Sequence, residues 1–462
     1  MFYANRQAAA GTFLVLFFLL FSTVFAYSGG SGTAEDPYQI ADANDLLALD
    51  GTTTDSSKYY ILTADIDLDP NLFPCGQCLF HMPVINHFTG TFDGNSHKIT
   101  NLTLDGGGRM GFFGNIDSGG TVKNLGIENC SVSGGGAGGL AGYNDGNISN
   151  CYLTGSVNGH GGEVGGLVGR NEGDNISDCC FTGVVSGSSG APGVGGLVGW
   201  NMGGISIINC HSTGTVSGNF NVGGLMGWNM GGSISNCYSM GTVSGSSGFV
   251  GGLVGKSEVG NISNCYSMST VSSSADTVGG LVGYNEGGNI SDCYSTGAVS
   301  GTYNIGGLVG HNDGDISNCY STGAVSGNRY IGGLAGIGGG SSSIINCYST
   351  GAVSGSQYIG GLVGGFFCNY VNDFWDVNSS GLTNGVGHVS SDPEGVTGKT
   401  TAEMKMLSTF AAAGWDFVDT WNIGENQTYP FLRGYSVADL NYDGLVNFAD
   451  FALFANRWLQ GD

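Results

Sequence analysis

The chain has 462 residues, among them 89 Gly and 7 Pro, and its 36 acidic residues against 12 basic ones give a formal charge of −24. Charged residues are only 10% of the total, against roughly 25% in an average globular protein. Phosphate binding needs clustered cations, so this balance excludes nucleic acid from the expected partners.

Residues 1–26 have the pattern of a signal peptide. Arg6 supplies the positive charge, residues 14–21 are an uninterrupted apolar run, and Val24 and Ala26 are small residues where a signal peptidase cleaves. A membrane anchor is the alternative, but the apolar run is shorter than the ~20 residues that a span needs. We therefore expect cleavage after Ala26, a secreted or cell-surface protein, and no membrane span after cleavage.

Residues 27–109 are predicted to form an N-terminal cap and the first, irregular coils. The stretch ADANDLLALD predicts a short helix that turns Leu46, Leu47 and Leu49 onto the first coil, because an open end of stacked strands needs cover. The segments YYILTADIDL, FTGTFDG, KITNLTL and VKNLGIENC read as strands.

Two polar groups in this region have more than one interpretation. The aspartates of ADIDLD, at 65, 67 and 69, could hold a metal, but a strand with alternate residues inward is favoured. Cys75 and Cys78 in PCGQC favour a local disulfide. A zinc site with His81 or His87 is the weaker alternative, because no second CxxC occurs.

Residues 110–365 are dominated by a repeat. GGLxG recurs nine times at intervals of 26 to 30 residues, and Phe112 takes the same place one interval earlier, so the array has about ten units. The nine leucines are Leu140, Leu167, Leu197, Leu225, Leu253, Leu281, Leu308, Leu334 and Leu362.

A second string, which approximates Ile-x-(Asn/Asp)-Cys-Tyr-x-x-Gly-x-Val, follows each of the first eight. Its Ile, Cys and Val keep fixed offsets while the connections vary in length, which indicates packed segments joined by loops. These segments are short, β-branched and bounded by Gly, Ser and Asn, so they are strands rather than helices. One apolar column per strand buries itself only by stacking on the next coil. The sequence therefore predicts an all-β fold, a parallel β-solenoid of about ten coils.

Two columns of the repeat have predicted roles in the rod. The Asn or Asp before each Cys is expected to stack at a corner and to hydrogen-bond along the rod. The Cys column is expected to be a ladder of free, buried thiols, because in-register stacking holds the residues slightly too far apart for unstrained disulfides.

A surface column follows each GGLxG and is the candidate binding site. In seven repeats it holds a ring or a cation, Lys256 among them, and Asn comes next in six of the seven. Stacked at the coil spacing, such a strip could bind sugar rings or a peptide; the alternative is that it only shields the edge of the rod. The predicted ligand-binding residues are Tyr143, Arg170, Trp200, Trp228, Tyr284 and His311.

Residues 366–434 are richer in Trp and Phe and are predicted to form the C-terminal cap, with a short helix in TAEMKMLSTF. Residues 435–462 contain DLNYDGLVNFAD, which has oxygen ligands at positions 1, 3, 5, 7, 9 and 12 and Gly at 6, the pattern of a calcium loop leading into an amphipathic helix. An acidic, solvated tail is the alternative. The predicted calcium ligands are Asp439, Asn441, Asp443, Leu445 through its carbonyl, Asn447 and Asp450.

The repeats, such as GGLVGYNEGGNISDCYSTGAVSG at 279–301, resemble the GLUG motif of bacterial secreted and surface proteins. This resemblance covers about residues 30–434 and implies a right-handed β-helix in surface and adhesion contexts. The C-terminal loop resembles that of dockerin type I, with Asp450 at position 12. A full dockerin has two such loops and this chain has one, so the partner that the resemblance implies is a cohesin-like or sorting partner.

No catalytic motif stands out from the sequence. GHG occurs at 159–161, but the other polygalacturonase motifs (NTD, DD and RIK) are absent, as are a G-x-S-x-G elbow and an HExxH helix. The predicted function is therefore a non-catalytic extracellular solenoid for surface adhesion or polysaccharide binding. A polysaccharide-degrading β-helix enzyme, or a component of such a system, is one alternative, and a purely structural cell-envelope protein is the other.

Overall fold

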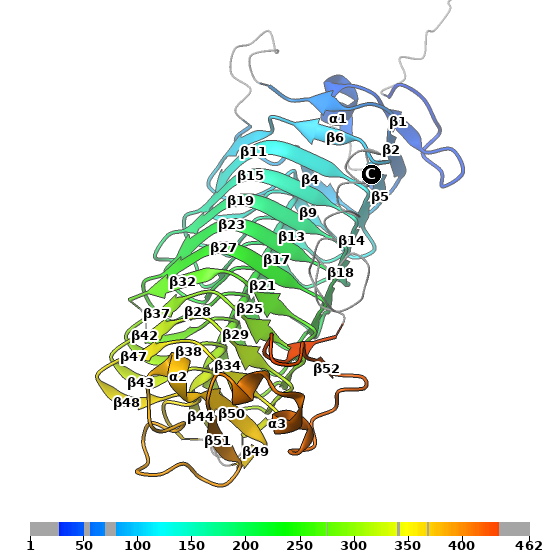
Figure 1. Cartoon of the computed structure of the whole chain (residues 1–462). Helices are drawn as coiled ribbons and strands as arrows, with labels where there is room; N and C mark the ends of the chain where they lie inside the picture. The colour runs from blue at the N-terminus through cyan, green and yellow to red at the C-terminus, as the bar shows by residue number, and fades with distance from the viewer. Residues whose placement is uncertain are drawn as a thin grey trace, which may run out of the picture.

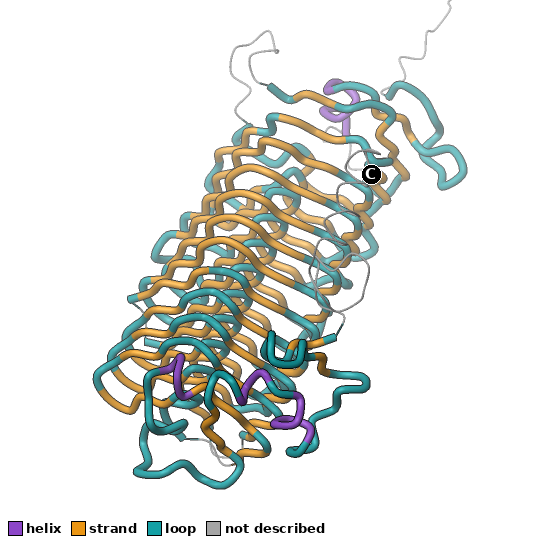
Figure 2. Tube along the Cα trace, viewed as in Figure 1, coloured by secondary structure: helices purple, strands orange, loops and turns teal. Residues whose placement is uncertain are grey.

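The computed structural model describes residues 27–49, 56–69, 80–274, 276–339, 342–366 and 369–433. Over these residues the chain winds into a rod, a parallel β-solenoid of about 11 turns (Figure 1). Each strand pairs in parallel with its counterpart in the next coil, and loops lie between the stacked strands (Figure 2). The predicted fold class is confirmed. The predicted signal peptide, the predicted disulfide of Cys75 and Cys78, and the predicted calcium loop lie outside the described residues.

One face of the rod carries the Ile column of the repeat. Its strands are short and in register, with Ile148 opposite Ile176 and Ile176 opposite Ile207. In the described chain this sheet consists of β1 (Tyr38–Ile40), β2 (Tyr59–Leu62), β5 (Thr91–Asp93), β10 (Thr121–Lys123), β14 (Asn147–Ser149), β18 (Ile176–Ser177), β22 (Ile207–Ile208), β26 (Ile234–Ser235), β30 (Ile262–Ser263), β35 (Ile290–Ser291), β40 (Ile316–Ser317), β45 (Ser343–Ile345) and β49 (Asn369–Val371).

A second face holds the longest strands and the Val column. Its strand from Gly126 to Gly134 has a register shift between Ile127 and Cys130. Its described strands are β3 (Ile66–Asp67), β6 (Lys98–Thr100), β7 (Thr103–Asp105), β11 (Gly126–Gly134), β15 (Tyr152–Gly159), β19 (Cys180–Gly187), β23 (His211–Gly218), β27 (Tyr238–Gly245), β31 (Tyr266–Ser267), β32 (Thr270–Ser273), β36 (Tyr294–Ser295), β37 (Val299–Ser300), β41 (Tyr320–Ser321), β42 (Val325–Ser326), β46 (Tyr348–Ser349), β47 (Val353–Ser354), β50 (Asp373–Asp376) and β51 (Val396–Lys399).

The GGLxG string makes the turn between the two remaining sheets. The sheet that precedes it consists of β8 (Arg109–Met110), β12 (Gly136–Gly138), β16 (Val164–Gly165), β20 (Val194–Gly195), β24 (Val222–Gly223), β28 (Phe249–Gly251), β33 (Thr277–Gly279), β38 (Tyr303–Gly306), β43 (Arg329–Gly332) and β48 (Gln357–Gly360). The sheet that follows it consists of β4 (Ile85–Phe88), β9 (Phe113–Ile116), β13 (Ala141–Asn144), β17 (Val168–Asn171), β21 (Val198–Asn201), β25 (Met226–Asn229), β29 (Val254–Ser257), β34 (Val282–Asn285), β39 (Val309–Asn312) and β44 (Ala335–Gly338).

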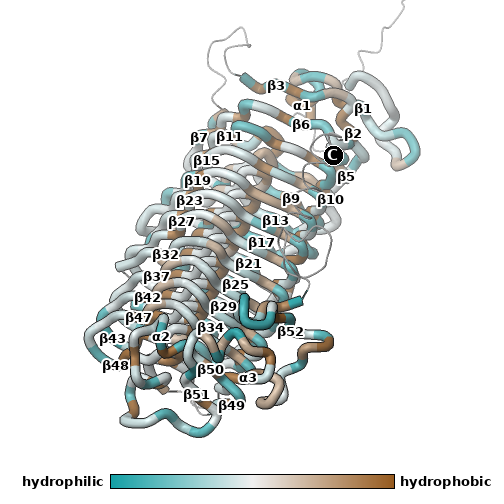
Figure 3. The backbone as a smooth tube through the Cα atoms, in the orientation of Figure 1, coloured by the Kyte–Doolittle hydropathy of each residue, from teal (hydrophilic) through white to brown (hydrophobic). Residues whose placement is uncertain are grey.

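The core is a set of apolar columns along the inside of the rod. All nine GGLxG leucines are fully buried. They stack as predicted, because the amide of Leu225 donates to the carbonyl of Leu253 at 2.9 Å and that of Leu253 to Leu281 at 2.8 Å. Burying one such side chain contributes about 1.5–3 kcal/mol. In Figure 3 the hydrophobic segments recur from coil to coil along the rod.

The corner before each Cys has the predicted amide ladder. Its residues have left-handed φ, from 51° at Asn150 to 57° at Asn372. Asn and Asp tolerate that conformation better than other non-Gly residues. The side chains bridge coils, as where Asn150 donates to Asn124 at 2.8 Å and Asn236 to Asn209 at 3.1 Å. The column therefore provides both the turn and a bond along the rod.

The ten cysteines that the structure describes are free thiols. Along the ladder, backbone amides of most cysteines donate to the sulfur of the Cys in the following coil, at 3.4 Å from Cys237 to Cys265 and from Cys265 to Cys293. The prediction of a buried thiol ladder is confirmed for these residues. Cys180 is the exception in burial, because it follows Cys179 and its side chain is half-buried.

At the N-terminal end, α1 (Ala43–Leu49) is the predicted short helix. Leu46 and Leu49 are buried, but Leu47 is 38% exposed. The prediction that Leu47 also turns onto the first coil is therefore wrong. Adjacent residues of a helix point in directions 100° apart, and two of the three leucines are enough to cover the coil. Ile66 and Leu68 point inward, as the strand interpretation of ADIDLD requires.

The C-terminal cap folds back along the outside of the rod. It contains α2 (Val377–Ser380), a 3₁₀ turn (Glu403–Lys405), α3 (Leu407–Ala411) and the antiparallel pair β52 (Trp421–Asn422) and β53 (Phe431–Leu432). Its Phe, Met and Trp side chains form a second core over a column of stacked tyrosines. Among the described residues, no helix is both long and apolar enough to cross a membrane.

Candidate functional site

The predicted surface column is one continuous line across the sheet from β4 to β44. Each member lies opposite the next, so Tyr143 faces Arg170, Arg170 faces Trp200, and Trp200 faces Trp228. The pairing brings all six predicted ligand-binding residues into a single strip. The full strip is His87, Asn115, Tyr143, Arg170, Trp200, Trp228, Lys256, Tyr284, His311 and Ile337.

The rings and cations of the strip stack on one another. Trp200 and Trp228 lie 4.6 Å apart between ring centroids, at an interplanar angle of 1°. The Arg170 guanidinium lies 5.1 Å from the Trp200 ring, and Lys256 Nζ lies 5.1 Å from Trp228. Stacking therefore covers the faces of the two indoles, and a ligand of the strip would meet ring edges.

A second column, two residues further along each strand, is largely acidic. Backbone hydrogen bonds hold it in register, because each of these amides donates to the preceding coil. The sequence analysis did not single out this column, although it is visible in the spacing as an acid after Tyr-Asn, Arg-Asn and His-Asn. Its members are Asp117, Asp145, Glu172, Met202, Met230, Glu258, Glu286 and Asp313.

The acids neutralise most cations of the strip. Arg170 Nε donates to Glu172 at 2.6 Å, and Lys256 Nζ lies 3.1 Å from Glu258 and 2.8 Å from Glu286. Burial lowers the pKa of Lys256, but the hydrogen bonds to the two glutamates outweigh it and raise the pKa overall. Most charges of the strip are therefore paired with acids of the protein itself.

The tyrosines of the strip bond to the same acids. Tyr143 Oη donates to Glu172 at 3.0 Å and Tyr284 Oη to Asp313 at 2.8 Å. Desolvation, reinforced by these carboxylates, raises the pKa of both phenols. Both rings therefore stay neutral hydrogen-bond donors across the physiological pH range.

The acidic column is interrupted at the two tryptophans. Met202 and Met230 take the positions of the acids there, and both are half-buried. Trp200, Trp228 and these two methionines form what we call the Trp–Met island, with an ion pair at each end: Arg170 with Glu172, and Lys256 with Glu258. Within this island neither the strip nor the acidic column carries a charged side chain.

Behind the strip, a buried amide ladder fixes the strand spacing. Asn144, Asn171, Asn201 and Asn229 are fully buried. Asn171 donates to Asn201 at 2.8 Å, and Asn201 donates to Asn229 at 3.0 Å. Since buried polar groups need partners, this ladder holds the strip residues in register from behind.

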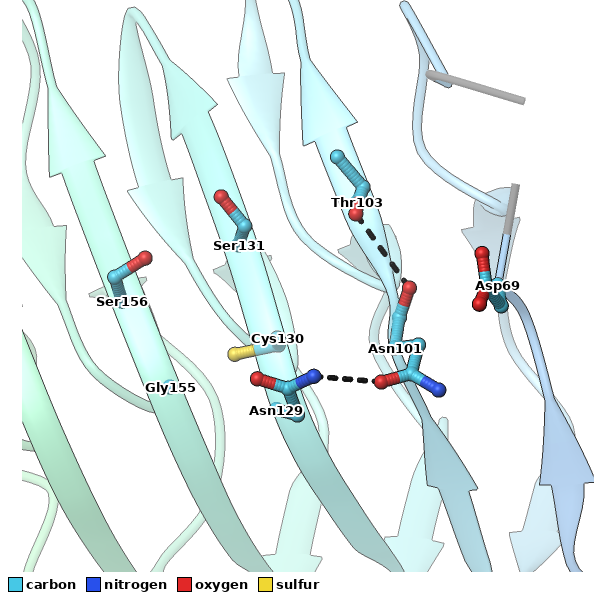
Figure 4. A pocket seen from close by; sticks show the side chains of 8 residues that line it. All are labelled: Asp69, Asn101, Thr103, Asn129, Cys130, Ser131, Gly155 and Ser156. Carbon is cyan, nitrogen blue, oxygen red and sulfur yellow. Dashed lines mark hydrogen bonds between the residues drawn. The ribbon is translucent and has the colours of Figure 1, made fainter. Parts of the chain in front are cut away.

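Two hollows open near the N-terminal end of the rod. One, of about 440 Å³, lies at the head of the strip and is lined by His81, Met82, Pro83, Asn86, Gly108, Arg109, Met110, Gly114 and Asn115. The other, of about 490 Å³, lies at the register shift of β11, where Asn129 donates to Asn101 at 2.6 Å (Figure 4). That second hollow is lined by Asp69, Asn101, Thr103, Asn129, Cys130, Ser131, Gly155 and Ser156.

Within the described residues, no group of three or more His, Cys, Asp or Glu side chains is placed to hold a metal ion. His81 and His87, which the weaker zinc interpretation invoked, contact the carbonyl of Asp105 and the carboxylate of Asp117 at 2.9 Å each. Arg109, which the sequence analysis did not single out, lies over the ring of Tyr143 at 4.8 Å.

Comparison with known families shows that the repeats are GLUG motifs. The model of "The GLUG motif" matches seven segments within the predicted solenoid. They are residues 133–158, 160–186, 190–217, 218–244, 274–300, 301–326 and 327–354.

Two curated relatives match parts of the chain. "Halomucin" of Haloquadratum walsbyi is 39% identical over 153 residues, which are 31% of this chain and 2% of the relative. A "Putative Gly-rich membrane protein" of Evansella cellulosilytica is 33% identical over 194 residues, 33% of this chain and 22% of the relative. The match thus spans less than a quarter of either relative.

Two solved structures align with the rod. A "putative immunoglobulin A1 protease from Bacteroides ovatus" has a TM-score of 0.42 at 22% identity, over 88% of this chain and 95% of that one. An "IgA1 Protease" has a TM-score of 0.34 at 20% identity, over 66% of this chain and 21% of that one.

Proposed function

We propose that this GLUG-repeat solenoid is an exported, non-catalytic protein that binds a polysaccharide or a cell-surface glycan through its strip. The observation that carries the proposal is the Trp–Met island. The acidic column, which is charged elsewhere, becomes apolar for two adjacent coils, where both tryptophans and both methionines are half-buried residues. Apolar surface beside fixed hydrogen-bonding groups is what sugar and small-ligand sites have in common.

The surroundings of the island fit a glycan. Glu172 and Glu258 flank it with carboxylate oxygens that accept hydrogen bonds from hydroxyl groups. The rod repeats the same backbone at each coil, so an extended chain could follow the strip across several coils. The printed names of the two relatives, "Halomucin" and "Putative Gly-rich membrane protein", support a surface or extracellular setting for this chain.

The test is retention on insoluble glycans with variants that alter the island in two ways. Trp200→Ala with Trp228→Ala removes the rings, and Met202→Glu with Met230→Glu continues the acidic column through the island without touching the stack. We expect each pair to weaken binding roughly tenfold or more, as the loss of a central aromatic contact does.

The control is His211→Ala with Tyr238→Ala. This pair is also stacked, with ring centroids 4.6 Å apart and an interplanar angle of 4°. It lies in the same two coils as the island, but on the face that holds the longest strands. Unchanged retention of both island variants, or an equal loss in the control, would show that the strip does not bind the glycan.

We further propose that residues 439–450 bind one calcium ion, on the strength of the ligand pattern in the sequence. The measurement is calorimetric titration of the full chain with calcium. Asp439→Asn with Asp443→Asn should abolish the tightest binding event, because two of the charged oxygen ligands are lost. Asp65→Asn serves as the control, and binding that survives the double substitution contradicts the assignment.

A further inference from the structure

The hollow at the head of the strip exists because one side chain is small there and another is missing. Asn115 stands in the column where most of the next coils carry a ring or a long cation. A Cβ built on Gly108 would meet nothing within 4 Å, so that wall is open space. At Gly114 the backbone instead approaches closely, since a Cβ would lie 2.8 Å from Pro83 and 2.9 Å from the carbonyl of Asn86. The hollow is therefore a gap in the strip with a fixed floor.

Arg109 is the arginine that lines this hollow, and it differs from the cations of the strip. The cationic groups of Arg170 and Lys256 lie within hydrogen-bond distance of glutamates, and His87 and His311 contact aspartates. Among the described residues, Arg109 has no carboxylate within ion-pair distance. Its side chain is exposed and is held by the Tyr143 ring, 4.8 Å from the guanidinium carbon.

The rest of the lining suits a sugar better than a free ion. Met82, 58% exposed, offers apolar surface beside the buried Pro83, while Asn86 and Asn115 offer amides. His81 Nδ1 lies 2.9 Å from the carbonyl of Asp105, so it donates there and leaves Nε2 for a ligand. Asp117, the first member of the acidic column, is held by His87 at 2.9 Å.

We propose that this hollow binds the anionic group of an acidic sugar, with the Arg109 guanidinium on a uronic-acid carboxylate or a sulfate ester. A guanidinium fork matches both groups through two parallel hydrogen bonds. The hollow continues the strip at Asn115, so an acidic residue of a glycan bound along the strip would end in it. The inference rests on the proposed glycan-binding function and adds a preference for acidic glycans.

The experiment compares a short oligogalacturonate, its methyl ester and an oligosaccharide whose only charged groups are sulfate esters, by calorimetry with the full chain. Esterification removes the charge and keeps the sugar. We expect the wild type to bind the free acid at least roughly tenfold more tightly than the ester, as one charge-assisted hydrogen-bond pair provides. Arg109→Gln should abolish that preference, and a sulfate-bearing ligand with the same Arg109 dependence would extend the site to sulfate.

Two further variants separate the hollow from general charge effects. Gly108→Leu fills the open space without a clash at Cβ and should weaken both the acid and the ester. Lys123→Gln makes the same charge change on the Ile-bearing face, where Lys123 pairs with Asp93 at 3.3 Å, and should leave binding unchanged.

The outcomes distinguish this inference from the function on which it rests. Equal affinity for acid and ester, or a preference that survives Arg109→Gln, overturns the acidic site while glycan binding through the island stands. Absence of binding to any glycan, with island variants indistinguishable from wild type, overturns both.

Discussion

At the scale of single residues, most columns of the rod repeat the same residue type from coil to coil. The informative positions are those where the residue type changes. Asp373 takes the place of the next cysteine in the thiol ladder. It is fully buried, and its carboxylate accepts from the amide of Cys347 at 2.9 Å and from that of Val371 at 3.1 Å. Desolvation, with a smaller contribution from Cys347, raises the pKa of Asp373 well above 3.8.

A raised folded-state pKa makes stability depend on pH in a defined direction. The native state holds the Asp373 proton where the unfolded chain has lost it, so the stabilisation is fully present below the unfolded pKa and is lost as pH rises through the folded pKa. Asp373→Asn removes this titration. We expect the variant to gain stability relative to wild type as pH rises from about 4 to about 8, by about 1.4 kcal/mol per unit of pKa shift, measured as urea midpoints.

Asp93 provides the opposite sign as a control. Burial alone would raise its pKa, but hydrogen bonds from Asn124 and Lys123 lower it below 3.8 overall. Its stabilisation is present above the unfolded pKa and is lost as pH falls through the folded one. Asp93→Asn should therefore lose stability relative to wild type at neutral pH and converge with it in acid. Matching slopes for the two variants would contradict both assignments.

At this scale the sequence predicted the features that depend only on which residue type fills each column of the repeat. The inward Ile, Leu, Val and Cys columns and the corner amides follow from spacing alone, and each lies where it was expected. The ion pairs of Arg170 and Lys256, and the lack of one at Arg109, depend on which long side chains reach each other between coils, and a one-dimensional pattern does not contain that information.

At the scale of the strand and the turn, Gly214 shows how closely coils approach. It has a φ of 137°, and an added Cβ would lie 1.9 Å from the carbonyl oxygen of Gly183. The same arrangement recurs at Gly183 and Gly241. The glycines here are required by contact between coils as well as by backbone conformation.

Two alanine substitutions separate those requirements. Gly204 has a φ of 79° but open space around its Cβ position, so Gly204→Ala should cost about 1 kcal/mol of unfolding free energy for the left-handed conformation alone. Gly214→Ala adds the clash and should cost about 3 kcal/mol or more. Urea unfolding of both variants is the measurement, and equal costs would show that contact between coils is not the constraint.

At this scale the short helix of TAEMKMLSTF was predicted as one element and is found as a 3₁₀ turn followed by α3. The break follows from Met406, whose extended backbone, with φ −105° and ψ 125°, both ends the first element and caps the second. Nothing in the local apolar pattern marks that residue. The difference between Leu47 and its neighbours is of the same kind, since packing against a particular coil decides it.

At the scale of the whole molecule, the predicted rod is found because its repeat is long and nearly invariant. The C-terminal cap was expected at the end of the rod but also lies along its side, where Trp421 contacts Tyr320 and Tyr348 at 6.1 Å between ring centroids. Tyrosines follow most cysteines of the repeat. Only the fold shows that the cap covers the later ones and leaves Tyr152 38% exposed.

The stacking of Leu225, Leu253 and Leu281 has a consequence for how such a molecule can change in size. These residues are 28 positions apart, and what surrounds each of them is supplied by the coils immediately before and after. Excision of one complete period would shorten the rod by one strand spacing of ~4.8 Å and would leave every inward column unbroken. The length of the rod can therefore change by whole coils, because gain or loss of a coil leaves the core packing of the others intact. A single-residue deletion within a strand instead turns the apolar face of that strand outward.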